Sequence, residues 1–178
     1  MAQEPIIHDV FEPKTATWQY IVADPATKTA IIIDSVLDFD PATSTVSTAS
    51  ADALLATVIE KGYHVSRVIE THVHADHLTA SAYLQSRLAS GVHRGAGADG
   101  GLRPELCIGG RVREVQERFA AKYGIPLEEC EGSFDHLIGD DEEFPLGELV
   151  VKALHLPGHT PDHMGYQIGC KSTTQPSS

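Results

Sequence analysis

The chain has 178 residues, of which 42% are hydrophobic and 21% charged, and this balance predicts one globular domain rather than a disordered chain. The formal net charge of −12 argues against a nucleic-acid surface and against docking on anionic lipid, and no apolar run has the length of a membrane span. Three cysteines without a CxxC pair favour a reducing compartment. We therefore expect a cytoplasmic protein, with a mitochondrial location as the alternative.

The first part of the chain alternates β-rich runs with one amphipathic segment. The Asp-Pro turn at 24–28 joins two β-rich runs into a hairpin, and the Asp-, Ser-, Thr- and Pro-rich residues 34–50 predict a loop. Gly62 follows a run of helical apolar spacing and is expected to end that helix. The expected elements are strands at 6–10, 18–23 and 29–34, a helix at 51–61 and a strand at 65–70.

The second part of the chain continues the alternation. The Gly-rich residues 91–110 predict a long surface loop, and Gly124 ends the last helix. The expected elements are helices at 78–89 and 112–123 and strands at 134–138, 149–156 and 164–168. Alternating strands and helices indicate an α/β (α+β) class. We expect one domain over residues 1–169 and a disordered tail at 170–178.

Residues 71–77 (THVHADH) gather three histidines and an aspartate directly after an expected strand. In an extended segment His72 and His74 point to the same side, so both imidazoles can bind one metal ion. Asp76 and His77 follow where the chain enters the next helix, and they can reach the same ion or a neighbouring one. Taken singly, Asp76 could be a helix N-cap and His77 a surface residue. The joint arrangement predicts a metal site.

A second cluster lies at residues 155–163 (HLPGHTPDH). His159 sits on a tight Pro-Gly turn after a strand, which suits a rigidly held ligand. We expect His155 and His163 to support the site rather than bind metal, and Asp162 to be a solvated turn residue. The sequence has no phosphate-binding loop and no nucleophile motif, so we expect no catalytic residue separate from the metal site.

The two clusters together resemble the HxHxDH and distant His pattern of the metallo-β-lactamase superfamily. Within the superfamily the chain looks most like the persulfide dioxygenases, with glyoxalase II as the near relative. The segments that carry this resemblance are FEP at 11–13, TATWQYIVAD at 15–24, IIIDSVLDFD at 31–40, ETHVHADHLTAS at 70–81 and LHLPGHTPDH at 154–163.

The resemblance implies a four-layer αββα sandwich and an iron(II) centre, with zinc as the alternative metal. It implies that His72 and His159 are the two histidine ligands and that His74 matches a superfamily metal ligand, which in the persulfide group lies near the iron without necessarily binding it. Asp76 and His77 match the second-metal ligands of dinuclear members. The implied activity is oxidation of glutathione persulfide by dioxygen to sulfite and glutathione.

The chain departs from this family after residue 169. The family continues with a strand that ends in Gly-Asp and supplies a metal-binding aspartate, whereas residues 170–178 (CKSTTQPSS) contain no such pair. We therefore expect the second half of the sandwich to be largely missing and leave the activity of this chain open. The alternatives are a glyoxalase II-type thioester hydrolase and a non-catalytic metal-binding fragment. Homodimer formation is a further open expectation.

Overall fold

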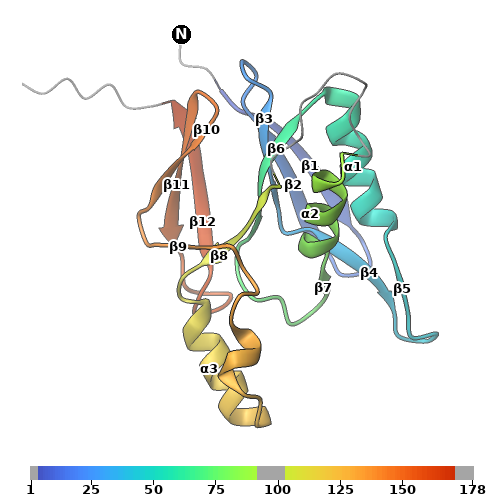
Figure 1. Cartoon of the computed structure of the whole chain (residues 1–178), viewed down its shortest axis with the longest axis vertical. Helices are drawn as coiled ribbons and strands as arrows, with labels where there is room; N and C mark the ends of the chain where they lie inside the picture. Colours follow the sequence, from blue (N-terminus) through green and yellow to red (C-terminus); the bar gives the residue numbers. More distant parts are fainter. Residues whose placement is uncertain (1–3, 92–102, 171–178) are drawn as a thin grey trace, which may run out of the picture.

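The computed structural model describes residues 4–91 and 103–170, without the side chain of Cys170 (Figure 1). Its strands are β1 (Ile6–Glu12), β2 (Thr17–Ala23), β3 (Thr29–Ile33), β4 (Val36–Asp40), β5 (Thr45–Ser47), β6 (His64–Glu70), β7 (Leu78–Thr79), β8 (Glu105–Gly109), β9 (His136–Ile138), β10 (Glu143–Leu146), β11 (Leu149–His155) and β12 (Met164–Cys170). Its helices are α1 (Ala49–Lys61), α2 (Ser81–Ala89), α3 (Val112–Tyr123) and the short 3-10 helix η1 (Leu127–Cys130).

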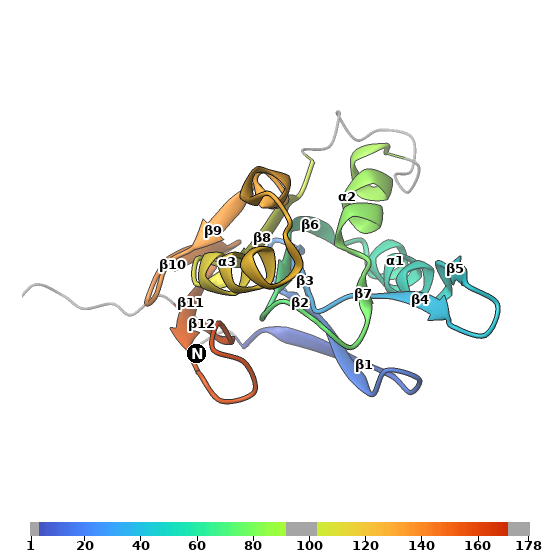
Figure 2. The same cartoon turned by 90° about the horizontal axis from the view of Figure 1, so that it is seen from below.

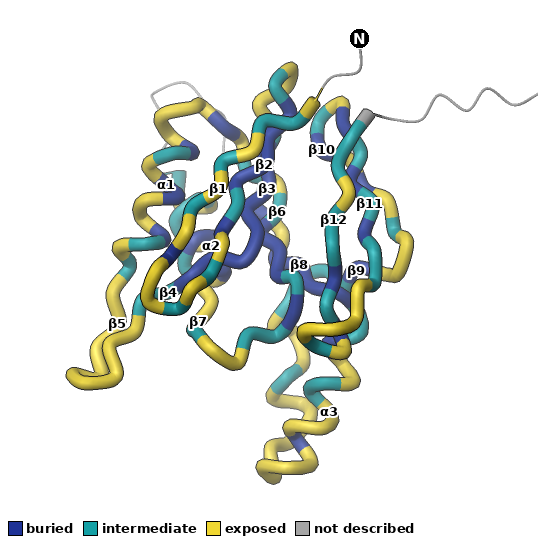
Figure 3. Tube along the Cα trace, turned by 180° about the vertical axis from the view of Figure 1, so that it is seen from behind, coloured by how far each residue is buried: buried dark blue, intermediate teal, exposed yellow. Residues whose placement is uncertain are grey.

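The central sheet has six strands in the order β1-β2-β3-β6-β8-β9. The first three strands are antiparallel neighbours, as the expected hairpin requires, and β3, β6, β8 and β9 run parallel. The Ile31–Ile33 run of β3 is buried on both sides, which is typical of an inner strand covered on both faces. Figure 3 shows this dark blue, buried core along β2, β3 and β6.

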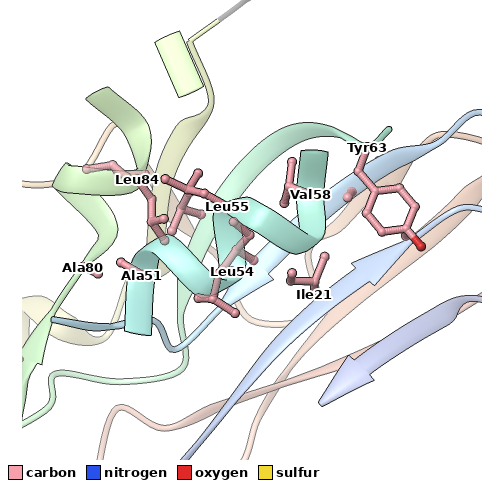
Figure 4. Close-up of a cluster of buried hydrophobic side chains, with 13 residues drawn as sticks. Ile21, Ala51, Leu54, Leu55, Val58, Tyr63, Ala80 and Leu84 are labelled. Carbon is pink, nitrogen blue, oxygen red and sulfur yellow. The ribbon is translucent and has the colours of Figure 1, made fainter. Parts of the chain in front are cut away.

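Helices α1 and α2 cover one face of the central sheet, and β10, β11 and β12 form a second sheet against the other face (Figures 1 and 2). Leu54, Leu55 and Val58 of α1 pack against Leu84 of α2 and Ile21 of the sheet (Figure 4). A second cluster fills the space between the sheets. Its buried members include Ile31, Ile69, Leu146, Val151 and Met164. The described residues thus form helix, sheet and sheet layers of a mixed α/β fold, as predicted.

Three hairpin turns share one sequence pattern: an acid, a proline, any residue, a threonine, any residue and a threonine. The turns are 12–17 (EPKTAT), 24–29 (DPATKT) and 40–45 (DPATST). In each turn the residue between the threonines has a left-handed φ, at Ala16, Lys28 and Ser44. In each turn the first threonine hydroxyl lies 2.7–2.9 Å from the acid and 2.8–2.9 Å from the second threonine hydroxyl. The acidic side chain therefore fastens each turn internally.

Asp24 in the second of these turns also reaches the second sheet. Its Oδ2 accepts the Glu148 N–H at 2.8 Å, beside the Thr27 hydroxyl at 2.7 Å. Burial opposes ionisation of this carboxyl, but the donated hydrogen bonds outweigh it and lower the pKa of Asp24. Gly147 has a φ of +61°, and a Cβ there would collide with Asp24 and Thr27. The turn and the β10–β11 connection therefore fit closely together.

Several sequence expectations need correction. Residues 34–50 are not a loop, because β4 pairs with β5 and with β7. The helix expected at 78–89 begins only at Ser81, because Leu78 and Thr79 are held extended by pairing with β4. The loop expected at 91–110 contains β8, a parallel strand of the central sheet, while its residues 92–102 lie outside the described part. Strand β12 extends to Cys170, and the remaining expected tail, 171–178, also lies outside that part.

The two helix ends that the sequence predicts at glycines are confirmed. Gly62 and Gly124 end α1 and α3 in the left-handed conformation, each with a φ of 66°. Cys107 and Cys130 are free thiols, and burial raises the pKa of Cys107 to about 12. Within residues 4–91 and 103–170, no helix combines the length and the apolar character needed to cross a membrane.

Candidate metal centre

Parallel pairing of β3 and β6 brings two carboxylates to one edge of the central sheet. Ile33 pairs with Ile69, so Asp34 and Glu70 follow at the same edge. Asp34 has a left-handed φ of 52°, a conformation that Asp tolerates better than most residues, and both side chains are largely buried. The histidine-rich residues 71–77 begin at this point, so their first side chains meet two buried acids.

Asp34 fixes the orientation of His72 through Thr71. The Thr71 hydroxyl donates to Asp34 Oδ2 at 2.7 Å, and its single proton is then used. The same hydroxyl oxygen lies 2.9 Å from His72 Nδ1, so it accepts the Nδ1–H. Burial and the neighbouring charge of His74 lower the pKa of His72 to about 4. His72 is therefore neutral at pH 7, with its lone pair on Nε2.

His74 is held by both acids. Its Nε2 lies 3.1 Å from Asp34 Oδ1 and 3.1 Å from Glu70 Oε2. Carboxylates only accept, so Nε2 carries a proton and Nδ1 is left for a metal. Burial opposes the charged form, yet the bonds to Asp34 and Glu70 raise the pKa of His74 to about 10. Binding a metal at Nδ1 must then displace a proton.

Glu70 is anchored on its other oxygen. Its Oε1 accepts the hydroxyls of Thr79 and Ser81, and its side chain is 2% exposed. Burial, together with the charge of Asp34, raises the pKa of Glu70 despite these bonds. β7 and the first residue of α2 thus support the position of His74 indirectly.

Asp76 and His77 complete a convergent group. His77 Nδ1 lies 3.4 Å from Asp76 Oδ1 and 3.4 Å from Thr17 Oγ1, while its Nε2 is buried without a hydrogen-bond partner. One donor atom each from His74, Asp76 and His77 lies within 4.8 Å of the others. The alternative of Asp76 as a helix N-cap is wrong, because α2 begins at Ser81 and Ala80 precedes it.

The loop between β11 and β12 brings His159 to the first cluster. The His72 ring centroid lies 4.8 Å from that of His159, 5.0 Å from that of His163 and 4.1 Å from that of His74. Within the part of the chain that the structure describes, neither His72 nor His159 belongs to a set of three donor atoms within 4.8 Å of one another. The two histidine clusters are therefore adjacent, with the tightest convergence around His74.

Asp162 corrects an expectation, because it is not a solvated turn residue. It is 2% exposed, its Oδ2 accepts the Val73 N–H at 3.2 Å, and its Oδ1 is buried without a partner. The Met164 N–H donates to the Thr71 carbonyl at 2.9 Å beside it. These bonds join the loop that carries His159 to the loop that carries His72. His155 contacts its own loop, through the Pro161 carbonyl at 2.9 Å.

The donor chemistry fits a transition metal. The hydrogen bonds leave His72 Nε2, His74 Nδ1 and His77 Nε2 for an ion, and His77 Nε2 is a buried atom without a protein partner. Imidazoles with a carboxylate suit iron(II) or zinc. Sequence reasoning missed Asp34, Glu70 and Thr71. The available signal was a carboxylate at the end of each of two apolar strands.

Comparison with known proteins identifies the family that the two histidine clusters resemble. The Metallo-beta-lactamase superfamily model matches residues 14–173. The chain is 40% identical over 164 residues to a probable metallo-hydrolase of Burkholderia pseudomallei, covering 91% of this chain and 51% of that protein. It is 36% identical over 159 residues to Glyoxylase B2 of Dictyostelium discoideum, covering 88% and 50%. It is 26% identical over 170 residues to the mitochondrial persulfide dioxygenase ETHE1 of Mus musculus, covering 94% and 49%.

The chain spans about half the length of these curated relatives. Among solved structures, ETHE1 from Myxococcus xanthus superposes with a TM-score of 0.61 at 25% identity, covering 92% of this chain and 53% of that one. The layered fold confirms the predicted family, as does the match of the family model to residues 14–173. The chain belongs to the metallo-beta-lactamase superfamily.

Proposed function

We propose that this chain is the metal-binding part of a persulfide dioxygenase-type enzyme, which oxidises glutathione persulfide with dioxygen to sulfite and glutathione. The observation that carries the proposal is the adjacency of His72 and His159, whose rings lie 4.8 Å apart although they come from different loops. The similarity to ETHE1 over most of the chain supports the same substrate class. An iron(II) held here would keep coordination positions open for dioxygen and a thiolate-type sulfur.

The surrounding residues would prepare the site. His72, His74 and His159 would hold the metal, while Asp34 and Thr71 orient His72 Nε2 towards it. Asp34 and Glu70 keep a proton on His74 Nε2, so that Nδ1 is the binding atom. Orientation of a ligand imidazole by a carboxylate also strengthens its basicity.

Asp76 would supply the anionic ligand. Its Oδ1 lies 3.9 Å from His74 Nδ1, and its side chain is 58% exposed. Imidazole and carboxylate donors together are typical of a non-haem iron oxygenase. Its exposure means that it can turn towards the ion without breaking a buried contact.

A thioester hydrolase of the glyoxalase II type is the second candidate. The convergence of His74, Asp76 and His77 supports it, since a second metal ion would find ligands there. The higher identity to a probable metallo-hydrolase and to Glyoxylase B2 than to mouse ETHE1 points the same way. Zinc in this site would lower the pKa of bound water for hydrolysis.

Two assays on the purified full chain separate these candidates. After anaerobic loading with iron(II), we expect oxygen uptake and sulfite formation with glutathione persulfide, and neither with the H72A or H159A variant. Zinc-loaded protein that cleaves a hydroxyacyl-glutathione thioester, without oxygen uptake by the iron form, would replace the proposal with the hydrolase. Stoichiometric metal binding without either turnover would identify a non-catalytic metal-binding fragment.

A further inference from the structure

A chain of hydrogen bonds leads from the β1–β2 turn to the metal centre. Glu12 is 6% exposed, and its Oε2 accepts the Thr15 hydroxyl at 2.7 Å. Thr15 Oγ1 lies 2.8 Å from Thr17 Oγ1, which lies 3.4 Å from His77 Nδ1. A buried acid in the N-terminal hairpin is thereby connected to a side chain 60 positions beyond Thr17.

The number of protons available fixes which group donates and which accepts in each of these hydrogen bonds. Glu12 also accepts the backbone N–H groups of Lys14 at 3.0 Å and Thr15 at 2.7 Å, and these bonds favour its ionised, accepting form. Thr15 gives its one hydroxyl proton to Glu12, so it accepts from Thr17. The Thr17 proton is then used, and Thr17 Oγ1 accepts from His77. His77 therefore carries its proton on Nδ1.

We propose that Glu12, Thr15 and Thr17 are positioning residues that fix the tautomer of His77 and present its Nε2 as a metal ligand. That Nε2 is buried without a partner, and the His77 ring centroid lies 4.2 Å from that of His74. The hydrogen bond at one imidazole nitrogen decides which tautomer is present. This inference rests on the group of His74, Asp76 and His77 proposed above as ligands of a second metal ion, but not on the choice of substrate.

The turn pattern by itself does not indicate a role in positioning His77, because it occurs three times in the sequence. Asp24 to Thr29 and Asp40 to Thr45 have the same internal bonds. Among the described turns of this pattern, the one at residues 12–17 has its last threonine beside a candidate metal ligand. The pattern is thus a turn-forming device, and its placement against His77 gives one copy an additional role. The other copies supply matched controls.

Asp76 is the competing explanation. Its Oδ1 also lies 3.4 Å from His77 Nδ1, where a carboxylate can accept a hydrogen bond from the Nδ1–H. Asp76 is largely exposed and free to turn towards solvent, whereas Glu12 is buried and the threonines are fixed within a turn. We therefore infer that the hydrogen bonds through Glu12, Thr15 and Thr17 set the tautomer of His77. Variants of Thr17 and of Asp76 test this assignment.

The tautomer can be read directly in the metal-free full chain. In a two-bond ¹H–¹⁵N correlation spectrum of histidine-labelled protein, with His77 assigned through H77Q, we expect the Nδ1–H tautomer in the wild type. T17V, which keeps the side-chain shape, should give a population of the Nε2–H tautomer. T17S restores the hydroxyl and should restore the wild-type pattern. D76A and the exposed-turn control T45V should leave it unchanged.

Zinc binding gives a second readout that does not depend on turnover. We expect T17V to lower zinc affinity at the site that includes His77 about 10- to 100-fold, the range typical of a lost partner behind a ligand histidine. T17S and T45V should stay within about threefold of the wild type. An Nε2–H tautomer in the wild type would overturn the proposal. So would a T17V protein with the wild-type tautomer, or loss of the Nδ1–H tautomer in D76A. If T17V does not fold, the wild-type and T17S spectra still decide.

Discussion

Asp162 Oδ2 accepts the Val73 N–H at 3.2 Å and so joins the two loops that carry the candidate metal ligands. Replacement of Asp162 by alanine removes a buried acceptor and leaves this amide without a partner. We expect D162A to lower the free energy of unfolding by about 1–3 kcal/mol. We also expect weaker zinc binding, because His159 is no longer held beside His72.

Urea denaturation and a competition titration of zinc against a chromophoric chelator measure both effects. E60A is the control, since Glu60 is 71% exposed in its pair with Lys61, and such a pair contributes little. Wild-type stability in D162A would mean that the Val73 amide finds another partner.

The second prediction concerns Asp34, which holds both His72 and His74. The D34N variant keeps the volume of the side chain but loses the charge that orients the two imidazoles. Its amide offers one accepting oxygen where the carboxylate offers two, so Thr71 and His74 compete for it. We expect zinc affinity to fall about 10- to 100-fold, measured by chelator competition. D9N, at an exposed position of β1, should bind zinc as the wild type does. Equal loss of affinity in both variants would show a nonspecific charge effect.

The third prediction concerns the fit between the β2–β3 turn and the second sheet. Gly147 has a left-handed φ, and an added Cβ would collide with Asp24 and Thr27. Because both strain and overlap oppose it, we expect G147A to cost more than about 1 kcal/mol in unfolding free energy. G169A is the matched control, with no neighbouring atom near the added carbon. Similar thermal or urea midpoints for the two variants would contradict the predicted overlap.

The fourth prediction is a pH dependence of stability. In the folded protein, hydrogen bonds hold the pKa of Asp24 below the ordinary value of 3.8. The stabilisation is therefore complete above about pH 4 and disappears as the pH falls through the folded pKa. Urea denaturation at a series of pH values should show wild-type stability falling below pH 4. The decline should be shallower in D24N, and parallel curves would remove Asp24 as a contributor.

The sequence was sufficient to predict most elements that follow a simple apolar pattern. The isoleucines of β3 and the leucines of α1 lie where their spacing requires, and Gly62 ends the helix. Elements stabilised by distant partners were not predictable in this way. Strand β4 has polar residues, and its extended form depends on pairing with β5 and with Leu78 and Thr79. Strand β8 is short, with Pro104 before it and Gly110 after it, and its place between β6 and β9 decides its conformation.

The same limit applies to the candidate site. Its histidines stand out because they are clustered in sequence, whereas the groups that orient them are dispersed. Glu70 reads as the last residue of a strand, and Asp162 reads as a turn residue. Their roles depend on His74 and on Val73, and the latter contact spans 89 positions. Local sequence therefore indicated the candidate metal ligands, and the fold revealed the groups that orient them.

The bond from the Met164 amide to the Thr71 carbonyl has a consequence for how this centre can be observed. Amide protons exchange with solvent when their hydrogen bonds open. The Met164 amide proton exchanges only when β12 separates from Thr71, at the start of residues 71–77. The Val73 amide proton exchanges only when these residues separate from Asp162. Two neighbouring exchange rates thus report, residue by residue, whether the loops separate together or independently. Addition of a metal ion should slow both rates by the same factor if the loops move as one unit.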